Sequence, residues 1–138
     1  MSLLGIFDVS GSALSAQSVR LNVTASNLAN AETVSSSIDK TYRARQPVFA
    51  AAMNDFGENQ SGIGVKVKGI IESQAELRMR YQPDHPMANE EGYIFLPNVN
   101  AVEEMANMIS ASRSYQSNVE TMNTSKQLLL ATLRLGQQ

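Results

Sequence analysis

A single histidine stands beside an aspartate, and this pair is the one place in the chain where nucleophilic catalysis could be sought. Asp84 and His85 lie within the sequence Pro-Asp-His-Pro at residues 83–86. With a serine as nucleophile, the pair could complete a catalytic triad. The chain has no Gly-x-Ser-x-Gly segment, which would present such a serine on a sharp turn. The flanking prolines favour a solvated turn histidine instead.

Two acidic doublets could supply paired carboxylates for general acid–base catalysis. They are Glu90–Glu91 and Glu103–Glu104. Adjacent side chains on a helix point about 100° apart, so neither doublet converges on one point. Carboxylates at the start of a helix offset its partial positive charge. We therefore expect the doublets to have this structural role, and we expect no enzymatic activity.

The composition argues against metal, cofactor and nucleic-acid sites. The chain has no cysteine and one histidine, which removes thiolate ligands, disulfides and any site built on two histidines. The glycines at 57, 62 and 64 are not followed by the Gly-Lys-Ser/Thr of a phosphate loop. A net charge of -2 does not favour binding to phosphate backbones. We expect no cofactor, no metal and no nucleic-acid partner.

Four cations alternate with apolar residues in two segments of the middle of the chain. They are Lys66 and Lys68 in the first segment, and Arg78 and Arg80 in the second. Such residues most often form the solvated face of a sheet. In an assembly they could instead meet acidic neighbours, and the sequence leaves both interpretations open.

A helix is predicted over residues 3–30, the first of the elements that must position these groups. Phe7, Leu14, Leu21 and Leu28 recur every seven residues and predict one narrow apolar stripe. Serine, threonine, asparagine and glycine are frequent in the same segment and are poor helix formers. Such a helix needs packing against neighbours to hold it.

Three asparagines of this first segment, Asn22, Asn27 and Asn30, admit two interpretations. A buried asparagine can fix the register between packed helices at some cost in stability. Alternatively, the three side chains simply lie on the solvent-exposed surface, with Asn30 at the end of the helix. The spacing alone does not choose between these interpretations.

The middle of the chain predicts short strands and turns. The best strand signal is Val65–Ile71, and further strands are predicted over 77–81 and 93–96. Residues 42–53 alternate poorly and contain Pro47, which favours a strand edge or a turn. The glycine-rich stretch 54–64 predicts a loop. We expect a small β segment that is too limited for a core of its own.

A second, longer helix is predicted from Asn98 to Gly136. Asn98 or Asn100 can cap its start, and Gly136 can end it. Its apolar positions alternate in steps of three and four over about four heptads. These positions are Met105, Met108, Ser112, Tyr115, Val119, Met122, Lys126, Leu129 and Leu133.

No segment approaches the roughly 20 apolar residues that span a bilayer. The N-terminal stretch resembles a signal peptide, but its first basic residue is Arg20 and Asp8 interrupts its apolar run. A cleavable signal begins with positive charge. We therefore expect no cleaved signal peptide and no direct insertion into a membrane.

Several segments resemble those of the flagellar axial proteins, the family of rod, hook and hook-associated subunits. The N-terminal signature is Leu-Asn-Val-Thr-Ala-Ser-Asn-Leu-Ala-Asn-Ala at 21–31, and the C-terminal ones lie at 112–120 and 127–137. The middle is similar to that of proximal rod subunits. These matching middle segments are residues 71–75, 81–86, 92–93, 96–100 and 102–105.

This resemblance implies a fold and a function. It implies a mainly α fold, in which the terminal helices pair as an antiparallel coiled coil that lines a tube, with a small β segment between them. The expected division is 1–32, 33–98 and 99–138. The implied role is a structural subunit of the proximal rod in the periplasmic part of the basal body, transmitting torque through helix contacts between subunits.

The resemblance also implies partners and a route of export. The partners are copies of the chain, other proximal and distal rod subunits, and the adaptor between rod and membrane ring. Export by the flagellar type III apparatus proceeds without cleavage. Phe49 and Met53 fit the short export-gate motif of rod subunits, an aromatic residue followed four residues later by an apolar one. They could equally be apolar anchors of the middle segment.

Other functions remain as alternatives at this stage. The second proximal rod protein shares the terminal signatures, although the middle segments favour the first. A free-standing coiled-coil adaptor or an export chaperone belongs to a different class, which would be helical alone and remain in the cytosol. A membrane-surface helix is disfavoured, because residues 3–30 contain one arginine and no lysine.

Overall fold

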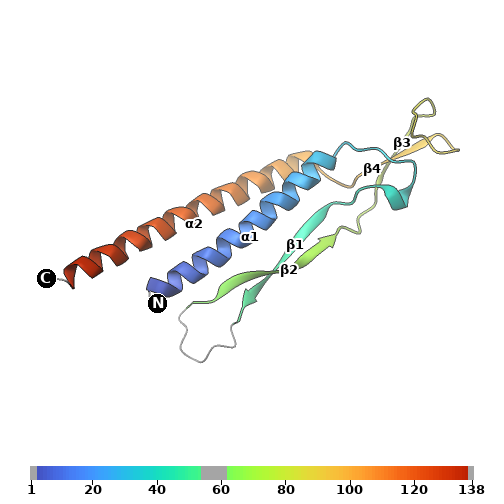
Figure 1. Cartoon of the computed structure of the whole chain (residues 1–138). Helices are drawn as coiled ribbons and strands as arrows, with labels where there is room; N and C mark the ends of the chain where they lie inside the picture. Colours follow the sequence, from blue (N-terminus) through green and yellow to red (C-terminus); the bar gives the residue numbers. More distant parts are fainter. Residues whose placement is uncertain (1–2, 54–61, 137–138) are drawn as a thin grey trace.

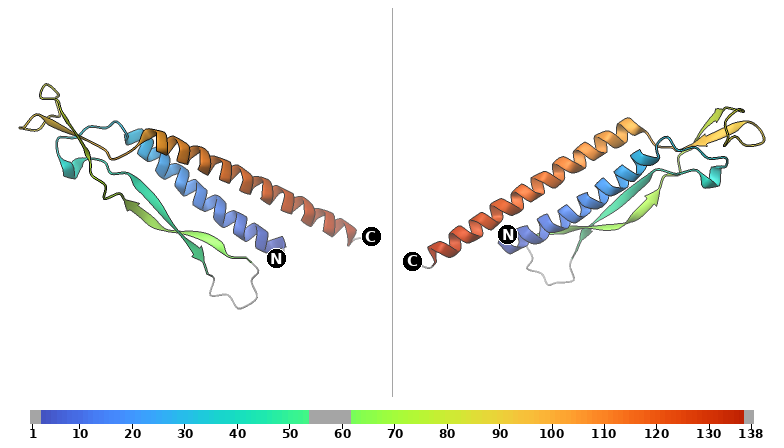
Figure 2. Two further views of the ribbon diagram at one scale, coloured as in Figure 1. Left: turned by 180° about the vertical axis from the view of Figure 1, so that it is seen from behind. Right: turned by 45° about the horizontal axis from the view of Figure 1, so that its top comes forward.

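The computed structural model describes residues 3–53 and 62–136, and it shows an elongated molecule built along two long helices (Figure 1). Helix α1 spans Leu3–Asn30 and helix α2 spans Ala101–Leu135. They lie side by side and run antiparallel, so that both chain termini lie at the same end (Figure 2). Neither helix is long and apolar enough to cross a membrane, among the residues described.

Helix α2 begins and ends at the residues that its sequence favours. The Asn100 side chain accepts a hydrogen bond from the Val102 backbone nitrogen at 3.1 Å and caps the first turn. Glu103 and Glu104 lie in that turn, where the helix dipole stabilises negative charge. At the other end, the Gly136 nitrogen donates to the Thr132 carbonyl oxygen at 3.1 Å.

A two-stranded antiparallel ribbon lies along α1, on the side away from α2 (Figures 1 and 2). It consists of β1, Arg45–Ala52, and β2, Gly64–Glu72, with a bulge between Val48 and Phe49. The ribbon approaches α1 closely at Gly64, where a Cβ atom would lie 2.7 Å from Ser12 Oγ. Only glycine permits this approach.

A second antiparallel pair forms the far end of the molecule, beyond the C-terminal end of α1 (Figure 1). It consists of β3, Arg78–Tyr81, and β4, Tyr93–Leu96. Gly92 turns the chain into β4 with φ of 83°, a conformation that favours glycine. We call residues 78–96 the tip hairpin.

The hydrophobic core is small and sits where the helices meet the strands. Its buried members are Ala31, Ala44 and Val99, and Tyr42 and Ala101 pack against them. The short 3₁₀ helix η1, Ile38–Lys40, lies in the connection that brings the chain from α1 to this core. The core therefore ties the end of α1 to the start of α2.

The expected fold class is wrong in two respects. The segment between the helices is not a small β patch, because it forms two separate two-stranded sheets with strands of up to nine residues. The helices are antiparallel, but they are not shown to form a coiled coil.

The residues that α2 buries explain why the coiled coil was the wrong prediction. They are Glu104, Ala111 and Ser125, which recur at multiples of seven and therefore share a face. A coiled coil needs large apolar side chains at such positions. Met105 lies about 100° further round the helix and is 51% exposed.

One predicted element falls only partly within the described residues. The loop predicted over 54–64 includes residues 54–61, which lie outside them. The described part of the stretch begins at Gly62, and from Gly64 it belongs to β2.

Candidate functional site

Asn27 lies in the last two turns of α1 with only 1% of its surface exposed. Its side-chain nitrogen donates to the Arg45 carbonyl oxygen at 2.8 Å and to Glu104 Oε2 at 3.0 Å. Its side-chain oxygen accepts from the Tyr42 hydroxyl at 2.8 Å and from the Arg45 backbone nitrogen at 2.9 Å. These bonds use the full hydrogen-bonding capacity of an amide. We call the four residues the Asn27 junction, which fixes α1, β1 and α2 in one register.

Glu104 is the buried charge of the Asn27 junction and is 8% exposed. Its carboxylate accepts from the Asn27 amide, and within residues 3–53 and 62–136 no basic side chain forms an ion pair with it. The charge lies in the first turn of α2, where unpaired backbone N–H groups create a positive potential. The position on the helix therefore stabilises this carboxylate, which forms no ion pair with a described residue.

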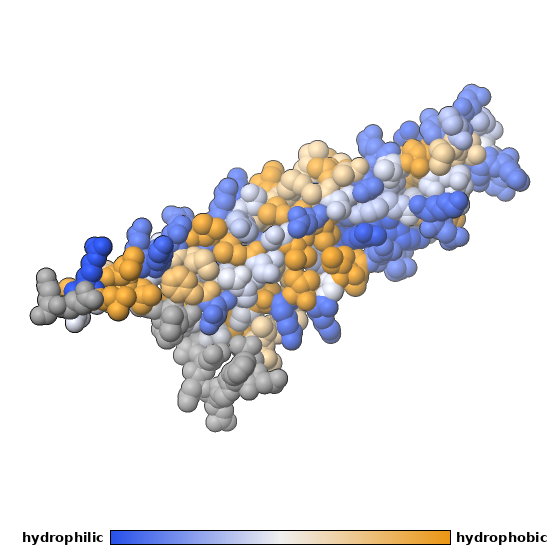
Figure 3. All heavy atoms as spheres, in the orientation of Figure 1, coloured by the Kyte–Doolittle hydropathy of each residue, from blue (hydrophilic) through white to orange (hydrophobic). Residues whose placement is uncertain are grey.

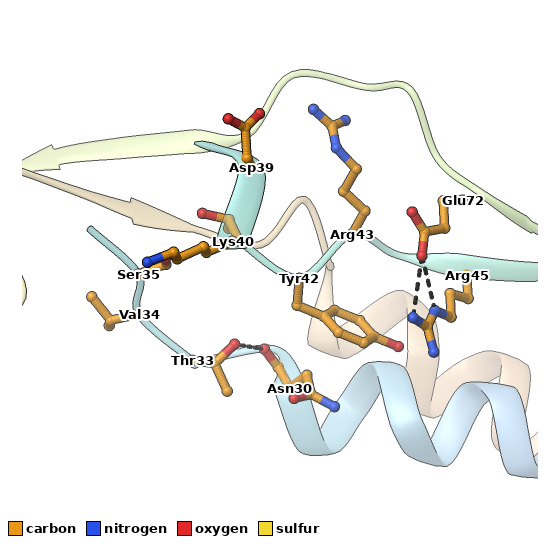
Figure 4. Close-up of a pocket in the computed structure, with 11 residues that line it drawn as sticks. Asn30, Thr33, Val34, Ser35, Asp39, Lys40, Tyr42, Arg43, Arg45 and Glu72 are labelled. Atoms are coloured by element: carbon orange, nitrogen blue, oxygen red, sulfur yellow. Dashed lines mark hydrogen bonds and ion pairs between the residues drawn. The ribbon is translucent and has the colours of Figure 1, made fainter. Parts of the chain in front are cut away.

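Tyr42 connects the Asn27 junction to a polar pocket of about 450 Å³ at the surface. Burial raises the pKa of the Tyr42 hydroxyl, and the Arg45 guanidinium opposes this rise. The guanidinium lies 5.4 Å from the centre of the Tyr42 ring and 3.2 Å from Glu72 Oε1. Figure 4 shows Tyr42, Arg45 and Glu72 together along the wall of this pocket. A tyrosine hydroxyl is protonated at neutral pH and can donate a hydrogen bond, and the raised pKa extends this state to higher pH.

A second amide, that of the half-buried Asn98, ties the strands to the start of α2. Asn98 Oδ1 accepts from the Ala44 backbone nitrogen at 2.8 Å, and Asn98 Nδ2 donates to the Ala75 carbonyl oxygen at 2.9 Å. Asn98 was one of two candidates for the cap of α2, and the cap is Asn100. Asn98 instead joins the segments that precede β1 and follow β2.

Arg78 anchors the tip hairpin to the helices. Its guanidinium donates to the carbonyl oxygens of Pro97 at 3.1 Å, and of Ala31 and Val99 at 3.4 Å. Ala31 directly follows α1, and Pro97 and Val99 lie in the connection between β4 and α2. Arg78 is therefore committed to contacts within the chain, and it is not part of a basic surface with Lys66 and Lys68.

The two helices touch through polar and small residues as well as apolar ones. Arg20 donates to Asn107 Oδ1 at 3.1 Å across the helix pair. Further along, a Cβ atom on Gly11 would lie 3.8 Å from the terminal methyl group of Met122. Small residues therefore let the helix backbones approach one another.

The apolar residues that were predicted to form the helix stripes divide into two groups in the structure. Those at or near the helix pair are half-buried: Phe7, Leu14, Leu21, Leu28, Met108, Val119, Met122 and Leu129. The others are exposed: Met105 at 51%, Tyr115 at 38% and Leu133 at 57%. Contacts with other subunits, for which all of them were proposed, stay a prediction.

The other two predicted asparagines differ from Asn27. Asn22 is exposed on α1. Asn30 is half-buried, and its amide donates to the Ser26 carbonyl oxygen at 2.8 Å within the same helix. Only Asn27 reaches across to other elements, so it is the asparagine that sets register inside the chain.

Phe49 and Met53, the predicted export motif, lie within strand β1 and directly after it. Phe49 belongs to β1 and is 40% exposed, and Met53 follows the strand and is 77% exposed. Neither residue is fully packed against the helices. Their role in export stays a prediction.

His85 lies in a turn of the tip hairpin, where its Nδ1 accepts from the Met87 backbone nitrogen at 3.1 Å. Asp84 beside it is exposed. In the described part of the chain no cluster of three histidine, aspartate or glutamate residues could hold a metal ion. The His85 imidazole is bound to the backbone of its own turn, and the structure gives it no hydrogen bond to Asp84.

Sequence reasoning did not single out Tyr42, and it gave Asn98 and Arg78 other roles. Each acts through partners more than ten residues away, such as Asn27 for Tyr42 and Ala31 for Arg78. No periodicity marks a contact of this kind. The alternation of Arg78 with Met79 predicted the strand but gave no sign of the partners of the guanidinium.

Two protein families match the two ends of the chain. Residues 7–34, which contain most of α1, match the family described as "Flagella basal body rod protein". Residues 90–135, which contain β4 and α2, match "Flagellar basal body rod FlgEFG protein C-terminal". The family matches therefore include the two helices that the Asn27 junction joins.

Relatives match over the whole chain. The flagellar basal-body rod protein FlgC of Salmonella typhimurium is 53% identical over 137 residues, covering 99% of this chain and 100% of that protein. The protein of the same name from Yersinia enterocolitica is 54% identical with the same coverage. That of Borreliella burgdorferi is 35% identical over 151 residues and covers 99% of both chains.

Proposed function

Because the chain belongs to the FlgC family of flagellar basal-body rod proteins, we propose that it builds the proximal rod by packing its helices against those of neighbouring subunits. It is a structural protein of the flagellar basal body. The neighbours in this proposal are copies of the chain, other rod subunits and the adaptor between rod and membrane ring. The protein acts mechanically, without enzymatic activity, and torque passes through the contacts between subunits.

The observation that carries this proposal is the exposed apolar end of α2. Leu128, Leu130, Leu133 and Leu135 are between 46% and 75% exposed. Their spacing along the helix places Leu128 and Leu135 on one side and Leu130 and Leu133 on the other. This end of α2 extends past the start of α1 (Figure 1), and apolar surface is visible there (Figure 3). A helix end that is apolar on several sides is usually buried in a larger assembly. Neighbouring subunits would supply the missing burial.

A second exposed apolar group near the start of α2 supports the same packing. Val102, Met105 and Ile109 are 76%, 51% and 55% exposed. Their spacing of three and four places them together on the face of α2 opposite Ala111. Two separated contacts on one helix suit a subunit that touches more than one neighbour.

The assembly proposal is tested by placing charges on the exposed apolar end. Replacing Leu130 and Leu133 with aspartate should leave the stability of the isolated chain within about 0.5 kcal/mol, because both residues are exposed. Rod assembly and swimming should be lost, since two charges would be buried without partners. Basal bodies are then isolated and their content of the subunit is measured.

The matched control replaces Thr124 and Gln127, exposed polar residues of the same helix, with aspartate. It should assemble and swim normally. If the Leu130 and Leu133 variant swims like the wild type, the exposed end of α2 is not a subunit contact.

Export by the flagellar type III apparatus is the other part of the proposal. It is supported by the family membership, and by the weak helix propensity of α1, which suits a chain that threads a channel before folding. Phe49 and Met53 are exposed in the folded subunit, so replacing both with alanine should disturb packing little. The double variant should accumulate in the cytoplasm and be missing from the periplasm. A normal periplasmic level would remove the export role of these residues.

A further inference from the structure

The tip hairpin carries an acidic surface with exposed apolar side chains. Asp84, Glu90 and Glu91 are exposed, and among the described residues none of their carboxylates has an ion-pair partner. Tyr81 and Met87 beside them are 62% and 43% exposed. We call these five residues the tip surface. The cations of the tip hairpin are Arg78 and Arg80, and the Arg78 guanidinium is bound by backbone carbonyl oxygens, so negative charge predominates on the tip surface.

The β1–β2 ribbon carries a surface of the opposite charge. Lys66 and Lys68 are exposed, and neither ammonium group has an ion-pair or hydrogen-bond partner within the described part of the chain. Ile70 follows the two lysines at the same two-residue spacing along β2, and it is 52% exposed. We call Lys66, Lys68 and Ile70 the ribbon surface. The other charges of the ribbon, Arg45 and Glu72, form an ion pair with each other.

The two surfaces of one molecule are held apart by the helices. The Val65 nitrogen donates to Ser12 Oγ at 3.0 Å, which fixes the ribbon surface beside the first half of α1. Arg78 donates to the Ala31 carbonyl oxygen, which fixes the tip hairpin beyond the other end. Ser12 and Ala31 are roughly 28 Å apart along the helix axis. The tip surface and the ribbon surface of one molecule therefore lie apart, and a contact between two such surfaces would join two molecules (Figure 1).

We propose that the tip surface of one subunit docks on the ribbon surface of a second copy, so that copies associate head to tail. Such a contact joins two different patches and repeats in an open line or a ring rather than closing a pair. The opposite charges select the orientation and speed the encounter. Burial of the exposed aromatic, methionine and aliphatic side chains supplies most of the free energy. This proposal rests on the assembly function above.

Introduced cysteines test the contact directly, because the natural chain has none. Cells produce two versions of the subunit together, one with Lys68→Cys and one with Glu90→Cys. Basal bodies are isolated and oxidised. We expect a disulfide-linked dimer that contains one copy of each version, identified by mass. Either version alone should give at most a background level of dimer, and so should Lys68→Cys paired with Gln116→Cys on the exposed face of α2.

Charge exchange provides an independent test in the same cells. Replacing Lys66 and Lys68 with glutamate, or Glu90 and Glu91 with lysine, should each lower the incorporation of subunits into basal bodies at least tenfold. Combining the four substitutions should restore it, because the charges are again complementary. If these side chains instead face solvent in the assembled rod, combining the four substitutions would not restore incorporation.

Three outcomes would overturn the proposal. They are the absence of the mixed dimer, a disulfide to another rod protein in its place, and loss of incorporation that the fourfold variant does not restore. In each case the assembly function is judged separately by the Leu130 and Leu133 variant. Failure of the head-to-tail contact is therefore distinguishable from failure of the rod function.

Discussion

The Asn27 junction and the C-terminal end of α2 meet opposite requirements. The junction is polar and buried, and every hydrogen-bonding atom of the Asn27 side chain has a partner inside the chain. The end of α2 is apolar, and Leu130 and Leu135 are 46% and 75% exposed. The hydrogen bonds of the junction are all made within the single subunit, whereas the apolar side chains at the end of α2 are not buried there. The difference indicates a subunit that orders itself at one end and leaves the other for its neighbours.

The largest effect on the isolated chain is expected from Asn27→Ala. The substitution leaves the Glu104 carboxylate, the Tyr42 hydroxyl and both Arg45 backbone groups without their buried partner. It should lower the free energy of unfolding by about 3–5 kcal/mol, measured by urea denaturation. The control Asn22→Ala changes an exposed asparagine of the same helix and should stay within about 0.5 kcal/mol. If both substitutions lowered the free energy of unfolding equally, the Asn27 junction would not be the region that orders the isolated chain.

A smaller effect is expected from Ala111→Leu, which tests the close contact of the helices. Ala111 has no exposed surface, so a larger side chain must push the helices apart. The free energy of unfolding should fall by about 1–3 kcal/mol. Ala106→Leu, at an exposed position of α2, should have almost no effect on urea denaturation. If Ala111→Leu stabilises the chain, the helices pack through large side chains after all.

The smallest effect, and the one with a pH signature, is expected from Tyr42→Phe. Loss of one hydrogen bond to Asn27 should cost about 1 kcal/mol at neutral pH. Burial raises the folded-state pKa of Tyr42 above its ordinary value of 10.0. Below pH 10 both states hold the proton, and above it the unfolded state loses the proton first, so the stability from this group falls as pH rises through the folded pKa.

The measurement for Tyr42 is urea denaturation of both chains between pH 7 and pH 11. The wild type should lose more stability than Tyr42→Phe as the pH rises above 10. Tyr81→Phe, at an exposed tyrosine, should follow the wild-type curve. Parallel curves for the wild type and Tyr42→Phe would show that the hydroxyl is not held protonated by burial.

The secondary structure was largely predictable because it follows from local patterns. The helix predicted over 3–30 coincides with α1, and the strand predicted over 93–96 coincides with β4. For residues 42–53 Pro47 left a strand edge or a turn open, and the structure has strand β1 there. In a two-stranded ribbon each strand has a free edge, so the missing N–H of Pro47 is tolerated.

The packing was predicted less well, because it depends on contacts between distant residues. The heptad pattern predicted that α2 packs through the apolar stripe that begins at Met105. The helix instead buries Glu104, Ala111 and Ser125. A glutamate is a poor candidate for a helix interface on composition alone. It is buried here because Asn27, 77 residues earlier in the chain, donates to it. The possibility that Asn27 fixes register was visible in the sequence, but its partners were not.

Hydrogen–deuterium exchange along both helices tests the central claim most directly. In the isolated chain, we expect the slowest amide exchange near Asn27 and between Glu104 and Ala111, and nearly unprotected amides at Leu128–Leu135. In isolated basal bodies the same C-terminal amides should become protected. Uniform strong protection along α2 in the isolated chain, or an unprotected C-terminal end in the assembled rod, would contradict the account.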